Sequence, residues 1–240
     1  MKYAILGDIH ANLEALEAVI RDAGAMSVDR FVCVGDIVGY NANPVECVEM
    51  ARSMNFVVVR GNHDHYCCHE DSLHDLNPVA ARVVVWTRER LSESELTYLK
   101  RMRMVRTVDG FTLVHSTLDM PEKWGYVFEE IEAGASFNYQ TTAVCFHGHT
   151  HVPVIYEKSS GIRRSSYVRF KAALGRKYFI NVGSVGQPRD GDPRAAYVIY
   201  DTGTKEGELR RIPYDVATAQ EKILAACLPR ALAARLAVGK

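Results

Sequence analysis

The sequence has no apolar run near the roughly 18 residues that a membrane-spanning helix requires. None of its six cysteines forms a C-x-x-C pair, so the usual spacing of a cysteine zinc or redox site is missing. The formal net charge is zero and no long basic block occurs. The composition therefore gives no reason to expect a nucleic acid or an anionic membrane as a partner.

The chain begins MKYAILGDIH, which is too short in its apolar part and reaches Asp8 too early to be a signal peptide. We therefore expect a cytoplasmic protein with reduced thiols. The 240 residues also lack internal repeats, low-complexity segments and any linker that would separate two domains. We expect a single domain over residues 1–240, with a C-terminal helix from about residue 216. The sequence does not indicate an oligomeric state.

Strands and helices alternate in the first half of the chain. Strand patterns at 3–8, 31–36 and 56–62 are each followed by a helix pattern, and Asn12, Asn43 and Asn77 stand where these helices would begin. Such alternation predicts an α/β fold with a largely parallel sheet. In the second half strands dominate, with a hairpin pattern at 104–115 around Asp109-Gly110 and strands at 143–147, 153–157, 166–172, 177–182, 195–200 and 207–213. Two sheets packed face to face, with helices outside, is the most economical arrangement.

Polar residues stand where the expected strands end. The motifs are GDIH at 7–10, GDIVGY at 35–40, GNHD at 61–64, LVHS at 113–116 and FHGHTH at 146–151. In α/β proteins functional sites form at the carboxyl ends of strands, and glycine lets the backbone approach an ion closely. If the chain is extended there, residues two apart point to the same side, so Asp8 and His10 can reach one ion together, and His149 and His151 can reach the same ion or two adjacent ones.

The motifs supply seven candidate metal ligands, which are Asp8, His10, Asp36, Asn62, His115, His149 and His151. Seven ligands are too many for one tetrahedral zinc ion. They suit two ions with one shared carboxylate, for which Asp36 is the natural choice. Two ions about 3.5–4 Å apart would hold a hydroxide between them and clamp a phosphoryl group.

Each fragment alone has a plainer interpretation. A lone Gly-Asp after a strand is usually a turn, and a lone His-x-His is more often surface or core than metal site. It is the joint occurrence at five strand ends that favours a metal centre. His147 is expected on the opposite side of its strand, in the core. His65, His69 and His74 are expected in a polar loop, and the sequence leaves the roles of His65, Cys67, Cys68 and His69 open.

These motifs resemble the signature of the calcineurin-like metallophosphoesterase superfamily, which is D-x-H, G-D, G-N-H-[DE], a single H and G-H-x-H in that order. The segment INVGSVGQPRDGDPRAAYVIYD at 180–201 is similar to small bacterial and archaeal members, so the resemblance covers roughly residues 1–201. It implies a four-layer α/β/β/α sandwich of two mixed sheets flanked by helices. Ala11 and Ser116 stand where the family often has glycine.

The resemblance also implies a role for each matching residue. Asp8, His10 and His151 would hold one metal ion, Asn62, His115 and His149 the other, and Asp36 would bridge them. His63 would donate a proton to the leaving group, and Asp64 would orient His63. The D-R-G arginine of the protein serine/threonine phosphatases is absent, which counts against a dedicated protein phosphatase and favours the phosphodiesterase-like branch.

We therefore expect hydrolysis of small phosphodiesters, including nucleotides, by a metal-bridging hydroxide. Alternatives are a phosphomonoesterase, a dinucleoside polyphosphate hydrolase or a non-catalytic binding scaffold. The ligand set suits two divalent transition-metal ions, with Mn favoured and Fe, Zn, Co or Ni as alternatives. Candidate substrate-binding residues are Arg189, Arg194, Tyr40 and Asn41, although a surface turn around the two arginines is an equal alternative.

Overall fold

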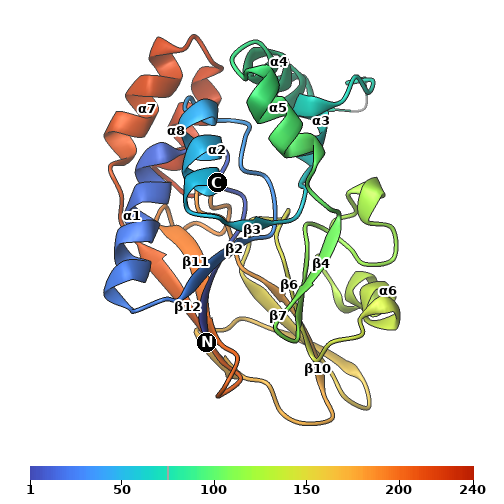
Figure 1. Ribbon diagram of the computed structural model, residues 1–240. Helices are drawn as coiled ribbons and strands as arrows, with labels where there is room; N and C mark the ends of the chain where they lie inside the picture. The colour runs from blue at the N-terminus through green and yellow to red at the C-terminus, as the bar shows by residue number, and fades with distance from the viewer. Residues whose placement is uncertain (75) are drawn as a thin grey trace.

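The fold consists of two six-stranded sheets packed face to face between layers of helices (Figure 1). The structure is a computed structural model that describes residues 1–74 and 76–240. In Figure 1, α1 lies to the left of the strands, α2, α7 and α8 lie above them, and α6 lies to the right. The predicted α/β/β/α architecture is confirmed.

The first sheet joins the N-terminal half of the chain to its C-terminal strands. Its order is β3 (Val57–Val58), β2 (Arg30–Cys33), β1 (Lys2–Leu6), β11 (Ala195–Asp201), β12 (Glu206–Ile212) and β9 (Arg169–Lys171). Strands β3, β2 and β1 are parallel to one another, whereas β11, β12 and β9 add in antiparallel fashion. The carboxyl ends of β1, β2 and β3 therefore lie at one edge.

The second sheet contains the hairpin that the sequence predicts around Asp109. Its order is β4 (Val105–Val108), β5 (Phe111–Val114), β6 (Val144–His147), β10 (Lys177–Asn181), β7 (Val154–Lys158) and β8 (Ile162–Ser165). Strands β5, β6 and β10 are parallel, and the remaining pairs are antiparallel. The carboxyl ends of β5 and β6 again share an edge.

Eight α-helices cover the sheets in the described residues. They are α1 (Leu13–Ala25), α2 (Pro44–Ser53), α3 (Asn62–Cys68), α4 (Pro78–Arg88), α5 (Glu93–Lys100), α6 (Glu130–Tyr139), α7 (Val216–Ala225) and α8 (Arg230–Leu236), with a short 3-10 turn, η1, at Pro121–Lys123. The Asn12 side chain accepts a hydrogen bond from the Ala15 N–H and caps α1, as its residue type favours. No helix of the described chain combines the length and apolar character needed to cross a membrane.

Alternating side chains explain the layers. In β1, Ile5 contacts the cluster between the sheets, which includes Phe146 and Ile180 of the opposite sheet. Its neighbours Ala4 and Leu6 point the other way, into the cluster under α1 and α2. Strands buried on both faces have no room for polar residues, so the polar residues follow the strands.

The structure differs from the expected elements in three places. Strands β1, β2 and β3 stop before their polar residues, because the backbone must turn there to form a site. Residues 62–68, expected in part as a loop, form helix α3. Residues 162–165, which lie outside every expected strand, form β8. The C-terminal helix begins at Val216 as predicted, and a second helix, α8, follows Pro229, the residue expected to break or kink it.

Candidate metal centre

The fold gathers all seven predicted ligands at the carboxyl ends of the strands. Asp8 and His10 follow β1, Asp36 follows β2, and Asn62 begins α3 just after β3. His115 follows β5, while His149 and His151 follow β6. Each of the seven side chains is buried, with Asn62 the most exposed at 9%. Both sheets thus contribute ligands to one buried centre.

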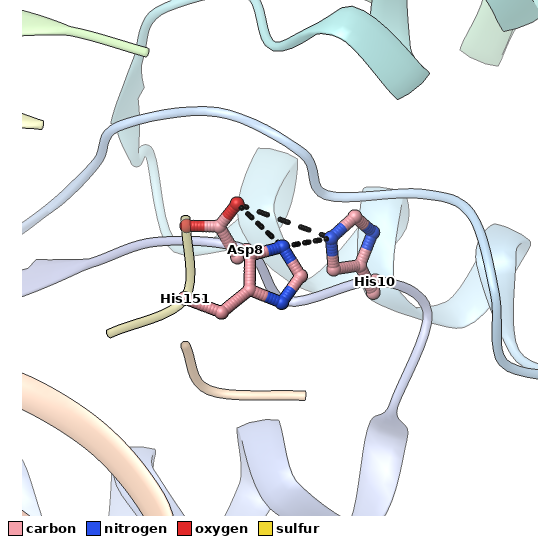
Figure 2. Close-up of side chains that lie close together, drawn as sticks. All are labelled: Asp8, His10 and His151. Atoms are coloured by element: carbon pink, nitrogen blue, oxygen red, sulfur yellow. Dashed lines mark hydrogen bonds and ion pairs between the residues drawn. The ribbon is translucent and has the colours of Figure 1, made fainter. Parts of the chain in front are cut away.

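Asp8, His10 and His151 form the first group (Figure 2). The Nε2 atoms of the two histidines lie 3.1 Å apart. Asp8 Oδ1 lies 3.2 Å from His151 Nε2 and 3.9 Å from His10 Nε2. Three potential ligand atoms therefore point at one another, as Figure 2 shows.

The second group contains His115, His149 and Asn62. His115 Nε2 lies 3.1 Å from His149 Nδ1 and 3.0 Å from Asn62 Oδ1. The Asp36 carboxylate lies between the two groups, since its Oδ2 is 3.6 Å from His10 Nε2 and 3.4 Å from His115 Nε2. This is the position that a bridging carboxylate would need.

The outer nitrogen of each of the four histidines is hydrogen-bonded to a backbone carbonyl. The pairs are His10 Nδ1 with Val38 O (3.1 Å), His115 Nδ1 with Val34 O (2.9 Å), His149 Nε2 with Trp124 O (2.9 Å) and His151 Nδ1 with Gln187 O (2.6 Å). A carbonyl oxygen can only accept, so the outer nitrogen of each ring carries the proton. The inner nitrogens then present lone pairs to the centre, which is how proteins prepare histidines to bind a metal ion.

Burial also shifts the pKa values of the histidines and carboxylates in the centre. It lowers the pKa of all four histidines and keeps the rings neutral. Burial also raises the pKa of Asp8 to about 6, and burial together with the Asp64 and Asp8 charges raises that of Asp36. Lone pairs and buried carboxylates that face one another without a proton donor are unfavourable. Cations in the two groups would relieve this.

The backbone of several residues in the centre is strained. Asp8, His10, Asp36, His149 and His151 all have a positive φ, between 49° and 70°. Such conformations cost energy for residues other than glycine and cluster at functional sites. The expectation that the D-x-H and H-x-H segments are extended is therefore wrong. The side chains converge because left-handed residues fold the chain back at each strand end.

The chain that carries this centre matches a known protein family. Residues 1–205 match the family model described as the calcineurin-like phosphoesterase superfamily domain. The chain belongs to this superfamily. Phosphoesterases of this kind hydrolyse phosphate esters, and the family together with the two ligand groups points to divalent metal ions.

Relatives extend the match to the whole chain. An uncharacterized protein of Methanocaldococcus jannaschii is 36% identical over 99% of this chain and 98% of its own length. The crystal structure of a metallophosphoesterase from Sphaerobacter thermophilus is 38% identical, has a TM-score of 0.89, and is matched over 100% of this chain and 99% of that one. A hypothetical protein from Pyrococcus horikoshii shares the fold at 18% identity, with a TM-score of 0.80 and 100% and 98% coverage.

In this phosphoesterase the Asp64 carboxylate is hydrogen-bonded to the backbone and not to His63, the residue that the resemblance implied it would orient. Its carboxylate accepts hydrogen bonds from the backbone N–H groups of Asp36, Ile37, Val38 and Gly61, at 2.8–3.3 Å. No hydrogen bond joins Asp64 to His63 among the described residues, and His63 Nδ1 is buried without a partner. Asp64 thus fixes the turn that carries Asp36, because four backbone donors satisfy both of its oxygens.

The candidate substrate-binding residues separate into two groups. The Tyr40 ring lies 4.7 Å from that of His10 and 4.4 Å from that of His63, and the Arg189 guanidinium carbon lies 5.6 Å from the Tyr40 ring centre. Asn41 is buried and donates to the backbone oxygen of His10 at 2.7 Å, so it supports a ligand. Arg194 is exposed and bound to Asp192 at 2.6 Å. The geometry favours Tyr40 and Arg189 over Arg194 and Asn41 as substrate contacts.

Other histidines and cysteines lie outside the centre. His147 is buried and stacked 4.0 Å from Phe179, as expected for a core residue. His65 is paired with Asp71 at 2.6 Å. Cys67 and Cys68 are buried in the core, which raises the pKa of both thiols, and no cysteine joins a potential metal group in the described residues.

Sequence reasoning missed the carbonyls of Trp124 and Gln187, and it drew no attention to the Gln187 side chain, to which Arg189 and Arg235 both donate hydrogen bonds. Backbone carbonyls have no residue signature, so their contacts with His149 and His151 could not be found in the sequence. Gln187 stands two residues before Arg189 in the loop that the sequence singled out. Arg235 belongs to the last helix, for which the motifs give no signal.

Gly148 permits the backbone of the G-H-x-H motif to touch Asp8. A Cβ atom there would stand 2.2 Å from Asp8 Oδ2. We expect Gly148→Ala to displace the Asp8 carboxylate and so to weaken metal binding by Asp8, His10 and His151. The free energy of unfolding should fall by about 1–3 kcal/mol. Metal content and thermal unfolding measure both effects. Gly24→Ala is the control, because a Cβ in helix α1 there would meet nothing within 4 Å. Unchanged metal content in Gly148→Ala would contradict this account.

Proposed function

We propose that this protein is a binuclear-metal phosphoesterase that hydrolyses small phosphodiesters. The observation that carries the proposal is the convergence of four histidine lone pairs and two buried carboxylates on two adjoining positions. Asp36 Oδ2 lies between these positions, within 3.6 Å of a histidine of each group. The two ions would activate a water molecule as the nucleophile and neutralise charge on the phosphoryl oxygens.

The contacts among the seven side chains suggest which ligands each ion would bind. Asp8, His10 and His151 would hold the first ion, and Asn62, His115 and His149 would hold the second, with Asp36 shared. Imidazole, carboxylate and amide donors suit first-row transition metals better than Mg or Ca. Mn is the favoured metal, with Fe, Zn, Co and Ni as alternatives.

His63 is the proposed proton donor to the leaving oxygen. Its backbone N–H donates to Asp36 Oδ1 at 2.8 Å, which fixes the residue beside the centre. Burial, and next the Arg189 charge, lower the pKa of His63 to about 3. The ring is therefore neutral in the free protein at neutral pH. It would gain its proton only when a bound phosphate brings negative charge next to it.

Substrate contacts complete the proposal. Tyr40 lies against His10 and His63, and Arg189 lies against Tyr40, so the two residues would bind phosphoryl oxygens on that side. The alternatives are a phosphomonoesterase and a dinucleoside polyphosphate hydrolase. Arg189 favours neither the diester nor the monoester by itself, because a guanidinium can bind either phosphate form.

A direct test reloads metal-stripped protein with Mn²⁺. We expect about two equivalents of bound Mn per chain and faster hydrolysis of bis-p-nitrophenyl phosphate than of p-nitrophenyl phosphate. Metal content and initial rates are the measurements. Faster cleavage of the monoester would replace the diesterase with a phosphatase. Protein that is folded, binds no Mn and hydrolyses neither ester would refute the proposal.

A further inference from the structure

Two arginines meet beside the metal centre, and one of them comes from the end of the chain. Arg189 Nη2 donates to Gln187 Oε1 at 2.8 Å, and Arg235 Nη1 donates to the same oxygen at 3.1 Å. Since both bonds end on one atom, the two guanidinium groups are neighbours. Burial and then the Arg189 charge lower the pKa of Arg235, which agrees with this closeness.

Neither arginine has an aspartate or glutamate partner in the described part of the chain, although Arg235 Nε is bonded to an oxygen of Lys240, the last residue of the sequence. The two acids of the same loop are occupied, because Asp190 pairs with Arg211 and Asp192 pairs with Arg194. Arg189 and Arg235 are both half-buried, and among the described residues neither forms an ion pair with an acidic side chain. The Nη groups of the two arginines meet only at the neutral Gln187 amide, and two neighbouring cations repel each other, so an anion bound between them would make the arrangement more favourable.

The Gln187 side chain gives a second, independent sign of a ligand. Gln187 is 1% exposed, and its Nε2 has no hydrogen-bond partner among the described residues. Its Oε1 is held by both arginines, so the free Nε2 of the same planar amide lies next to them. A buried donor without a partner is costly, and an anion in this place would satisfy it.

The arginine pair is connected directly to the first metal group. The backbone oxygen of Gln187 accepts from His151 Nδ1 at 2.6 Å, and the Arg189 N–H donates to the His151 oxygen at 3.3 Å. Arg189 also lies against Tyr40, which contacts His10 and His63. An anion held by the pair would therefore adjoin a phosphate held at the metal centre.

Arg235 is held in place before any ligand arrives. Its Nε donates to the backbone oxygen of Lys240. Helix α8 buries Leu232 and Leu236 in an apolar cluster with residues of α4 and α7, against which Tyr40 also packs. Arg235 lies beyond residue 205, where the family match ends. It is thus a feature of the C-terminal helices and not of the shared motifs.

We propose that Arg189, Arg235 and the Gln187 amide form a subsite for a second phosphate of the substrate. The inference rests on the proposed function and names its substrate class, which is esters whose scissile phosphoryl group is linked to a further phosphate. A simple diester has one negative charge, which the metal ions neutralise. A second phosphate brings additional charge, and paired guanidinium groups match its oxygens with several charge-assisted hydrogen bonds.

The test compares one-phosphate and two-phosphate probes in Arg235→Gln. For the Mn-loaded protein we expect kcat/KM on diadenosine diphosphate to fall about 10- to 100-fold, mainly through KM, as for loss of a charged hydrogen bond. The loss on bis-p-nitrophenyl phosphate should be clearly smaller. Calorimetric affinity for pyrophosphate should fall by a similar factor, and affinity for inorganic phosphate should fall much less. Arg235→Lys, which keeps the charge, should recover part of the loss.

Arg230→Gln is the matched control, because Arg230 is exposed on the same helix and the substitution removes the same charge. Arg230→Gln should leave the kcat/KM values on the two esters, and the affinities for pyrophosphate and phosphate, in the same proportion as in the wild type. Equal losses of Arg235→Gln on all four probes would assign Arg235 a structural role and overturn the subsite, as would no loss at all. If the wild type hydrolyses neither ester, the proposed function fails, and the pyrophosphate-to-phosphate affinity ratio still decides the subsite.

Discussion

Asp36→Asn is expected to remove both metal ions at once and to lower phosphodiester hydrolysis by at least about 10³-fold. Asp36 Oδ2 is the oxygen that lies within reach of a histidine from each group, so its charge serves both positions. The asparagine amide keeps the shape of the side chain and an oxygen for the His63 backbone N–H. The variant therefore removes charge with little change of packing. Bound metal per chain and kcat/KM on bis-p-nitrophenyl phosphate are the measurements.

Asp8→Asn is the matched comparison. Asp8 Oδ1 contacts the histidines of the first group only, so this variant should retain the ion held by His115 and His149. Loss of one ion in Asp8→Asn and of two in Asp36→Asn would establish the bridge. If both variants lose the same single ion, Asp36 belongs to one position and the binuclear arrangement proposed here is wrong.

Although Asp36→Asn should lose metal ions and activity, the metal-free variant should be more stable than the metal-free wild type. The pKa of Asp36 is raised in the fold, so the folded state favours the protonated carboxyl, and the metal-free protein loses stability as the pH rises above the ordinary carboxyl range. Metal-free Asp36→Asn should therefore unfold at a higher temperature than metal-free wild type at neutral pH. Each kcal/mol corresponds to about 2–4 °C in a chain of this size. Added Mn²⁺ should stabilise the wild type and not the variant.

Much of the fold was predictable because apolar strand patterns in the sequence are followed closely by glycine and polar residues that mark where each strand ends. β1 and β2 are apolar and each is followed by a Gly-Asp pair, so both the strand and its end are visible in the sequence. The order of strands in each sheet was not predictable, because β11 joins β1 across almost the whole chain and no local pattern encodes that pairing. Helix α3 was missed in part because its sequence, NHDHYCC, has no apolar periodicity.

The ligands were predictable for the same reason, but their surroundings were not. His149 and His151 stand in one short motif, yet their outer nitrogens bond to carbonyls at Trp124 and Gln187. Tertiary structure alone makes those contacts. Asp64 shows the same limit, since its place in GNHD suggested a partner for His63 whereas its carboxylate binds the backbone of the Asp36 turn. A motif identifies which side chains matter more readily than what each one touches.

His63→Ala should lower turnover and leave the metal content unchanged. The His63 ring lies beside Tyr40 and His10, and its backbone N–H, which contacts Asp36, is retained in the variant. If His63 protonates the leaving oxygen, kcat on diphenyl phosphate should fall about 10²- to 10⁴-fold. The loss on bis-p-nitrophenyl phosphate should be much smaller, because nitrophenolate leaves readily without a proton. Steady-state rates on the two diesters, with metal analysis of the same samples, make the comparison.

His65→Ala is the control, since His65 belongs to the same helix but pairs with Asp71. Its rates should stay within about twofold of wild type, because in the described residues its ring contacts Tyr66, His69 and Trp124 and none of the proposed ligands. Metal analysis decides the role of His63 because its ring also lies near His10 and Asp36, with potential ligand atoms within 4.8 Å of one another. Loss of metal from His63→Ala would make His63 a ligand. Equal losses on both diesters with metal retained would give it a role in positioning the phosphate. In either case the leaving group would have to take its proton from another source, such as solvent.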